Sequence, residues 1–308
     1  MWDRHPMTNI GGHLWTLLPE LTDRLWPPDV PASVPWSLQV GGAAGPVELT
    51  GELSEAAEAD TLLVVLHGLG GSAESRSSRR AALAAAQRGW SSLRVSLRGA
   101  DGRGHDLYHA GLTEDVGRVV ACPSARAHRR VFVYGASLGG HLALRHALDP
   151  HPSLDAVAAI CPPLDLAATA DAIDRGRAIV YRRAILRSLK RAYRTVAARR
   201  QMAFPVEQVE AVSRVREYDR LVVVPRFGFE SVDDYYESMS VGPHLDRLRV
   251  PALYLGSLGD PMVPYPTVHP SLQSAGRPLE ARVRRRGGHV GFPQAPEARV
   301  LDWLDRVG

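Results

Sequence analysis

The stretch Val131-Phe132-Val133-Tyr134-Gly135-Ala136-Ser137-Leu138-Gly139 decides the fold expected of this chain of 308 residues. The apolar run at its start predicts a buried strand, and residues 140–146 after it predict a helix. A serine on the sharp turn between strand and helix requires small neighbours two positions on either side, because the backbone bends too tightly for larger side chains. The pattern G-x-S-x-G therefore predicts a nucleophilic serine, Ser137, at the end of a strand.

Short apolar strands and helices alternate on both sides of this turn. Residues 33–40 and 46–53 flank a glycine-rich turn and predict an antiparallel hairpin. Residues 75–88 and 298–306 predict helices. Further strands are expected at residues 62–66, 90–97, 156–160, 252–255 and 281–284. The alternation predicts an α/β fold with a mostly parallel sheet flanked by helices.

The alternation of strand and helix breaks between Asp165 and about Leu248. Within this segment Tyr181, Ile185, Leu189, Tyr193 and Val196 recur at steps of three or four, which predicts an amphipathic helix with arginines on its other face. We expect a helical cap inserted above the carboxyl edge of the sheet. The predicted division is a core formed by residues 1–164 and 249–308, and a cap formed by residues 165–248.

The net charge of +4 comes from an unusual set of basic residues, 36 arginines and the single lysine Lys190. This composition is typical of codon bias in a GC-rich genome, so it does not by itself predict a nucleic-acid partner. Ten basic residues and no acidic residue fall between Arg175 and Arg200. A solvated helix face explains this run, and contact with an anionic lipid surface or substrate is the alternative.

Location and cofactors follow from what the sequence lacks. The apolar runs are too short to cross a bilayer, and the first residues do not resemble a signal peptide. The two cysteines, Cys122 and Cys161, form no disulfide framework, and their spacing matches no zinc pattern. We therefore expect a cytoplasmic protein without a metal.

A serine hydroxyl needs a base within hydrogen-bond reach, and the base needs an orienting carboxylate. Asp260 follows the expected strand 252–255, and His289 lies between glycines directly after the last expected strand. Both would reach the sheet edge where Ser137 lies. The order Ser, Asp, His along the chain is the order that α/β-hydrolases use. Ser137, Asp260 and His289 are therefore the candidate catalytic residues.

A tetrahedral intermediate also needs donors for its negative oxygen. His67-Gly68-Leu69-Gly70-Gly71 follows the expected strand 62–66, where this fold places one such donor. The backbone amides of Leu69 and Leu138 are the candidate oxyanion hole. A phosphate-binding loop is the alternative interpretation, but the Gly-Lys-Ser/Thr ending of a P-loop and the spacing of a dinucleotide motif are absent, so no cofactor is expected.

These residues resemble the YheT-type esterase family of the α/β-hydrolase superfamily over nearly the whole chain. Trp15 replaces a glutamine usual in the family's N-terminal motif. The most specific segments are 108–115 and 288–292. The segments that carry the resemblance are 13–19, 67–69, 98–99, 108–115, the Ser137 turn, 214–219, 234–236, 260–261 and 288–292.

The resemblance implies an acyl-ester hydrolase that acts on short-chain carboxylesters or acylglycerols, with some relatives acting on phospholipids. It assigns the charge relay to Ser137, Asp260 and His289, and it gives no role to Tyr108 or His109. An acyltransferase or thioesterase would use the same residues, so the sequence leaves both open. A non-catalytic binder on the same scaffold is the third possibility, because a fold does not fix a function.

Overall fold

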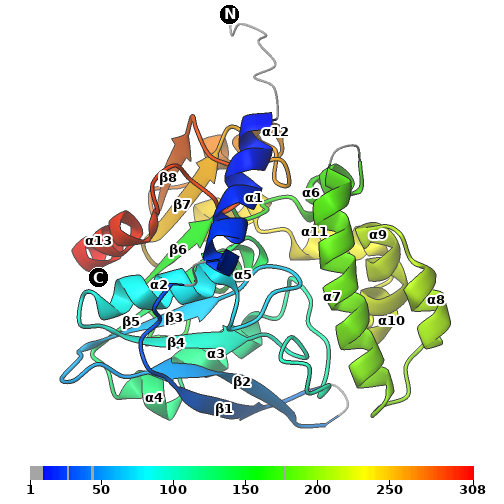
Figure 1. Cartoon of the computed structure of the whole chain (residues 1–308), viewed down its shortest axis with the longest axis horizontal. Coiled ribbons are helices and arrows are strands. Elements are labelled where there is room, and N and C mark those ends of the chain that lie inside the picture. The colour runs from blue at the N-terminus through cyan, green and yellow to red at the C-terminus, as the bar shows by residue number, and fades with distance from the viewer. Residues whose placement is uncertain (1–9, 26–27, 43–44, 176–177) are drawn as a thin grey trace, which may run out of the picture.

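An eight-stranded sheet forms the centre of the computed structural model, which describes residues 10–25, 28–42, 45–175 and 178–308 (Figure 1). The strand order is β1-β2-β4-β3-β5-β6-β7-β8. Strand β2 runs antiparallel to β1 and β4, and all other neighbours are parallel. The strands are β1 (Val34–Val40), β2 (Val47–Ser54), β3 (Thr61–Leu66), β4 (Ser91–Ser96), β5 (Arg130–Ala136), β6 (Ala156–Ile160), β7 (Ala252–Ser257) and β8 (Leu279–Arg284). The predicted hairpin and the predicted strands are confirmed.

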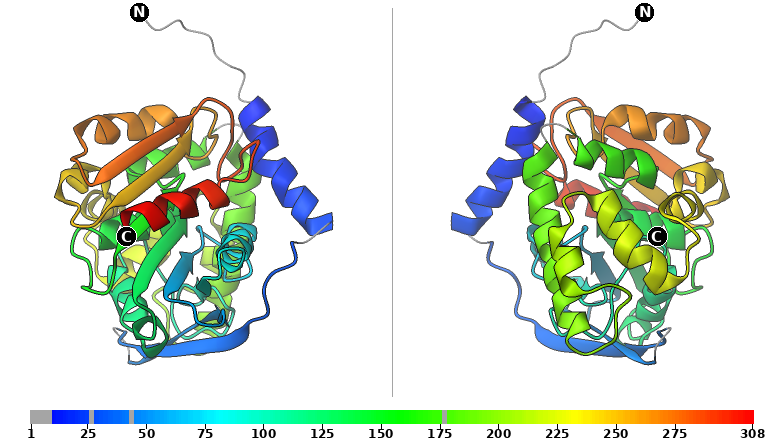
Figure 2. Two further views of the ribbon diagram at one scale, coloured as in Figure 1. Left: turned by 90° about the vertical axis from the view of Figure 1, so that its left-hand side faces the viewer. Right: turned by 90° about the vertical axis from the view of Figure 1, so that its right-hand side faces the viewer.

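Helices cover both faces of the sheet, because successive side chains of a strand point to opposite sides. Leu63 and Val65 of β3 pack with α2 (Arg76–Ala86) and α13 (Glu297–Val307) on one face. Leu62, Val64 and Leu66 pack on the other face with α3 (Thr113–Val120) and α5 (Leu138–His146). Figure 2 shows α2 and α13 together on their side of the sheet. This arrangement confirms the predicted α/β class with a helix-flanked, mostly parallel sheet.

The chain between β6 and β7 forms helices that lie beside the sheet (Figure 1). In α7 the apolar stripe predicted from the sequence is buried, from Tyr181 to Val196, and arginines occupy the outer side. The division of the chain into core and cap at residues 164 and 248 stays a prediction. The elements are α6 (Leu166–Asp174), α7 (Ile179–Ala197), α8 (Val206–Ala211), α9 (Val215–Tyr218), the π-helix η2 (Asp219–Val223), α10 (Val224–Phe227), α11 (Val232–Met239) and the 3₁₀-helix η3 (Gly242–Arg247).

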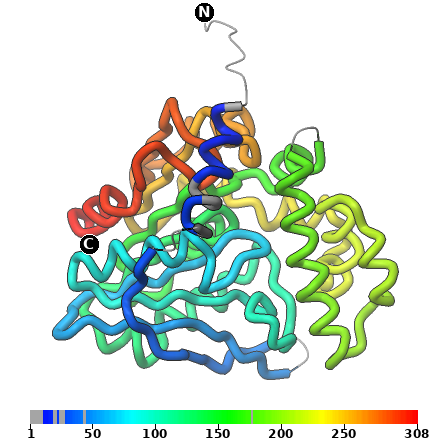
Figure 3. Tube along the Cα trace, in the orientation of Figure 1, coloured from blue at the N-terminus to red at the C-terminus, as the bar shows by residue number. Residues whose placement is uncertain are grey.

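Four further helices were not expected from the sequence: α1 (Ile10–Leu25), α3 (Thr113–Val120), α4 (Pro123–Arg126) and α12 (Tyr265–Ser274). Glycines at positions 11 and 12 and the internal Pro270 of α12 are poor helix formers, so local propensity does not favour these helices. Helix α1 crosses the loop that follows β8, although the two are far apart in sequence (Figure 3). Among the described residues, no helix has the length and apolar character needed to span a membrane.

Candidate active site

Ser137 lies between β5, which ends at Ala136, and α5, which begins at Leu138. Its φ of 52° and ψ of −118° are a backbone conformation that residues with a side chain rarely adopt. Its N–H donates to the carbonyl of Ile160 at 2.8 Å, and its carbonyl accepts the N–H of His141 at 3.0 Å. The structure thus places Ser137 on the strained strand-to-helix turn that the sequence predicts.

Both glycines of the G-x-S-x-G pattern are required by close backbone approach. A Cβ atom at Gly135 would collide with the backbone of Gly139. A Cβ atom at Gly139 would collide with the carbonyl oxygen of Leu66, at the end of β3. The turn therefore packs directly against the neighbouring strand, which brings Ser137 next to the loop that leaves β3.

Asp260 and His289 are joined by a hydrogen bond of 2.9 Å between Asp260 Oδ2 and His289 Nδ1. The other carboxylate oxygen of Asp260 accepts the backbone N–H groups of Met262 at 2.8 Å and Val263 at 2.9 Å. Asp260 is buried just past β7. The carboxylate is therefore fixed by its own turn, and it can hold the imidazole with Nδ1 protonated and Nε2 free to accept a proton.

The loop that carries His289 is held by two elements distant in sequence. Thr16 Oγ1 of α1 accepts the N–H of His289 at 2.8 Å. The Cys161 sulfur accepts the N–H of Val290 at 3.4 Å, and the Cys161 thiol donates to the carbonyl oxygen of Gly288 at 3.8 Å. Sequence reasoning did not identify Thr16 or Cys161. Thr16 lies within the N-terminal segment 13–19, which carries part of the family resemblance and was the sequence feature that could have pointed to this residue.

Cys161, Asp260 and His289 also form a group whose possible metal-binding atoms lie within 4.8 Å of one another. Burial, followed by the nearby Asp260 carboxylate, raises the pKa of the Cys161 thiol well above its usual value. Metals bind the thiolate, and His289 Nδ1 already bonds Asp260. The donor chemistry of this group therefore favours the hydrogen-bonded arrangement over a metal centre.

The two residues of the candidate oxyanion hole, Leu69 and Leu138, line the same cavity as Ser137 and His289. Leu138 is the first residue of α5, so its N–H has no acceptor within the helix. The loop with Leu69 is closed by a bond of 3.0 Å from the N–H of Gly71 to the carbonyl of Gly68. Both amides lie in segments that adjoin Ser137, as an oxyanion hole requires.

His67 fixes the start of this loop from inside the protein. Its Nδ1 donates to the carbonyl of Gly68 at 2.7 Å, while Nε2 accepts the N–H of Leu97 at 3.0 Å. Burial lowers the pKa of His67 to about 4, so the ring is neutral near pH 7. His67 is therefore a structural support of the loop that joins β3 to the cavity.

The segment 108–115 supports the cavity from the opposite side. Tyr108 accepts the N–H of Gly70 on its hydroxyl oxygen at 2.8 Å, and so positions the loop of Leu69. His109 is enclosed by aromatic rings, and burial lowers its pKa to about 3. Asp115 forms a bidentate ion pair with Arg98 at 2.6 and 2.7 Å, which anchors the segment. Tyr108 and His109 thus gain structural roles that the sequence did not provide.

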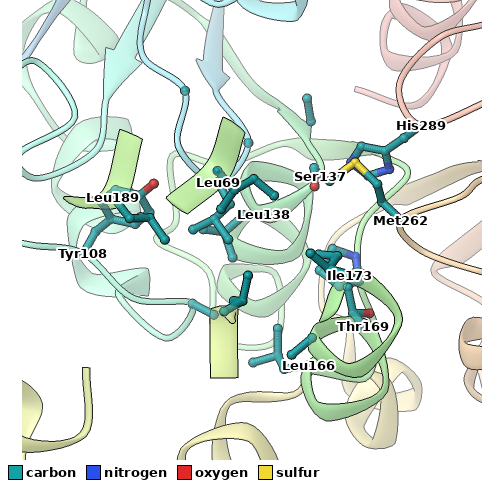
Figure 4. Close-up of a pocket in the computed structure, with 18 of the residues that line it drawn as sticks. Leu69, Tyr108, Ser137, Leu138, Leu166, Thr169, Ile173, Leu189, Met262 and His289 are labelled. Carbon is teal, nitrogen blue, oxygen red and sulfur yellow. The ribbon is translucent and has the colours of Figure 1, made fainter. Parts of the chain in front are cut away.

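A cavity of about 310 Å³ opens beside Ser137 and His289. Figure 4 shows Ser137, His289 and Met262 together at one side of it and Tyr108 at the opposite side. Strand ends of the sheet form one wall, and the helices between β6 and β7 form most of the rest. The apolar part of that helical wall includes Leu166, Ala170, Ile173, Ile185, Leu189 and Val223. This lining fits the apolar chain of an ester.

Comparison with known proteins identifies the family of this fold. The alpha/beta hydrolase family model matches residues 63–303. The Escherichia coli (strain K12) protein named "Putative esterase YheT" is 33% identical over 262 residues, which are 79% of this chain and 76% of that protein. An abhydrolase domain-containing protein of Dictyostelium discoideum is 26% identical over 83% of this chain and 67% of its own length.

Solved structures share the same architecture at lower identity. The esterase Pf2001 of Pyrococcus furiosus superimposes with a TM-score of 0.60 and 16% identity, over 92% of this chain and all of the other. The alpha/beta hydrolase GrgF of a Penicillium species gives a TM-score of 0.60 at 19% identity, over 89% of this chain and 99% of that one. At this identity the likeness concerns the fold.

Proposed function

The chain belongs to the alpha/beta hydrolase family, and we propose that within it the chain is a serine carboxylesterase acting through Ser137, His289 and Asp260. The observation that carries the proposal is the 2.9 Å bond between His289 and Asp260, in a loop that borders the cavity of Ser137. A serine on a strained turn, a base and a carboxylate that orients the base are the parts that acyl transfer requires.

In the proposed mechanism, Nε2 of His289 accepts the proton of Ser137 as the hydroxyl oxygen attacks the ester carbonyl. Asp260 stabilises the imidazolium that forms and fixes its orientation. The amides of Leu69 and Leu138 donate to the negative oxygen of the tetrahedral intermediate. The imidazolium then protonates the leaving alcohol, which yields an acyl-enzyme. Water, activated by His289, attacks this intermediate and releases the acid.

Cavity size suggests the length of the acyl chain. An engineered cavity of about 150 Å³ holds one benzene molecule. The cavity of about 310 Å³ is twice as large, and therefore fits an acyl chain of short to medium length. We propose short- and medium-chain carboxylesters or small acylglycerols as substrates.

Hydrolysis of p-nitrophenyl esters from acetyl to palmitoyl tests this function. We expect kcat/KM to be highest between butanoyl and octanoyl and at least about 10-fold lower for palmitoyl, because a longer chain cannot be buried. Ala170 lines the cavity from α6, and a phenylalanine in its place would fill part of the cavity. Ala170→Phe should therefore move the optimal acyl length toward acetyl. An optimum at palmitoyl would contradict the size argument, and no hydrolysis of any ester would contradict the esterase.

We also propose that the outer face of α7 contacts anionic lipid. Arg183, Arg187 and Arg191 are exposed on this helix. The apolar Ile179 and Val180 at its start are 36% and 57% exposed. A row of arginines beside exposed apolar side chains is typical of helices that lie at a membrane surface. The free, buried thiols of Cys122 and Cys161 support the proposal of a cytoplasmic location.

Sedimentation with lipid vesicles tests the surface contact. We expect binding to vesicles with phosphatidylglycerol and little binding to pure phosphatidylcholine. Reversal of three charges, in R183E/R187E/R191E, should weaken binding at least about 100-fold, since the loss of each basic residue removes roughly 1 kcal/mol at such a surface and each glutamate adds repulsion. Hydrolysis of a soluble ester serves as the folding control and should not change. Equal binding to both vesicles would refute the contact.

A further inference from the structure

The cavity beside Ser137 has a polar wall that no step of the proposed hydrolysis uses. It is formed by Asp219, Tyr108 and Tyr235, and we refer to these residues as the polar wall. Asp219 is the first residue of the π-helix η2, a rare conformation that is frequent at functional sites. Segments 214–219 and 234–236, which carry the family resemblance without a catalytic role, therefore meet at the cavity.

The two carboxylate oxygens of Asp219, a residue that lines the cavity, differ in their hydrogen bonds. Its Oδ2 accepts the hydroxyl of Tyr236 at 2.6 Å. Within the part of the chain that the structure describes, no donor bonds Oδ1, and the residue is half-buried on the cavity wall. Burial raises the pKa of Asp219 to about 7, the Tyr236 bond acts in the opposite direction, and Asp174 raises it further. A carboxyl group in such surroundings gains from a ligand that donates to it.

Tyr108 and Tyr235 add donors to the same wall. Each hydroxyl oxygen accepts a backbone N–H, from Gly70 at 2.8 Å and from Ala110 at 3.0 Å. Among the described residues, neither hydroxyl hydrogen has an acceptor. Burial raises the pKa of both tyrosines, that of Tyr108 to about 12, and Asp219 adds to both shifts. All three residues line the same cavity, and the ring of Tyr236, whose hydroxyl bonds Asp219, lies 5.1 Å from the ring of Tyr235.

This combination matches one kind of chemical group. A hydroxyl both donates and accepts, so it can bond Asp219 Oδ1 and receive a phenol hydrogen at the same time. A cation would use the carboxylate and leave both phenol hydrogens without an acceptor. An unsubstituted alkyl chain would cover Asp219 Oδ1 and both phenol hydrogens without offering them a hydrogen-bond partner, which is costly.

We propose that the polar wall binds a hydroxyl group of the ester substrate at a distance from the reacting carbonyl, so that favoured substrates are hydroxylated esters. Figure 4 shows Tyr108 on the side of the cavity opposite Ser137, with Leu69 and Leu138 between them, so that a hydroxyl bound at the polar wall would lie away from the reacting carbonyl. The inference rests on the proposed esterase function and names its substrate class. The hydroxyl belongs either to the acyl chain or to the alcohol, for example to glycerol.

The experiment compares kcat/KM for paired substrates. For the acyl side, p-nitrophenyl 6-hydroxyhexanoate is paired with p-nitrophenyl hexanoate, and the 8- and 10-carbon pairs extend the series. For the alcohol side, monohexanoylglycerol is paired with propyl hexanoate. We expect the wild type to favour the hydroxylated member about 10-fold or more in one of these arms, and that arm identifies where the hydroxyl lies.

Variants connect the preference to the polar wall. Asp219→Leu removes the acceptor and should reduce the preference to about 1, while hydrolysis of p-nitrophenyl hexanoate persists. Tyr235→Phe removes one donor, leaves the carboxyl in place, and should reduce the preference in part, so that the test does not depend on the folding of one variant. Glu237→Gln, an exposed position on α11, is the matched control and should keep the full preference.

The outcomes separate this inference from the proposed function. Hydrolysis without preference in either arm would overturn the hydroxyl site and leave the esterase intact. A preference that Asp219→Leu and Tyr235→Phe both retain would also overturn it. No hydrolysis of any substrate by the folded wild type would refute the esterase itself.

Discussion

Ser137→Ala should reduce kcat for p-nitrophenyl hexanoate about 10⁶-fold, with little change in stability. Without the hydroxyl no acyl-enzyme forms, and only the oxyanion donors and substrate binding would still accelerate attack by water. Alanine has the same Cβ as serine, so it adds no new contact at the strained φ of 52°.

A fluorophosphonate probe tests the same residue by a covalent readout. The wild type should gain the mass of one probe on the peptide that contains Ser137, and Ser137→Ala should gain none. Ser124→Ala, on α4 and far from the cavity, is the control and should react like the wild type. Activity of Ser137→Ala within 100-fold of the wild type would show that another group is the nucleophile.

Much of the fold could be predicted because its strands are locally encoded. Strands β3, β5, β6 and β7 are mostly apolar runs buried on both faces, which stand out without knowledge of the tertiary structure. Ser137 became a candidate because of the glycines that its turn requires. Asp260 and His289 became candidates because each comes shortly after a predicted strand, and parallel strands bring their carboxyl ends to one edge.

What the sequence did not reveal depends on contacts between distant segments. Helix α1 begins with glycines, and its link from Thr16 to His289 spans 273 positions. Cys161 supports the same loop from the end of β6, and its spacing from His289 carries no recognisable pattern. Asp219 is one of many acidic residues until the fold turns it toward the cavity. Tertiary packing alone gives these side chains their roles.

Asp260→Asn should reduce kcat about 10⁴-fold and leave KM nearly unchanged. The asparagine oxygen can still accept the N–H groups of Met262 and Val263, so the turn after β7 should remain folded. Its amide nitrogen would then face His289 Nδ1 as a donor. The imidazole would have to present a bare Nδ1 and carry its proton on Nε2, the atom that must accept the proton of Ser137. The variant therefore isolates the tautomer as the cause of the loss.

Steady-state kinetics with p-nitrophenyl hexanoate measure this effect, with Asp246→Asn at an exposed position of η3 as the matched control. Because the residues of a charge relay act as a unit, the double variant S137A/D260N should be no slower than Ser137→Ala alone. Additive losses would mean that Asp260 acts on stability or substrate binding and not through Ser137. A loss of less than 10-fold in Asp260→Asn would assign the orienting role to another group. Non-additivity together with an unchanged KM is the result that the bond between Asp260 and His289 requires.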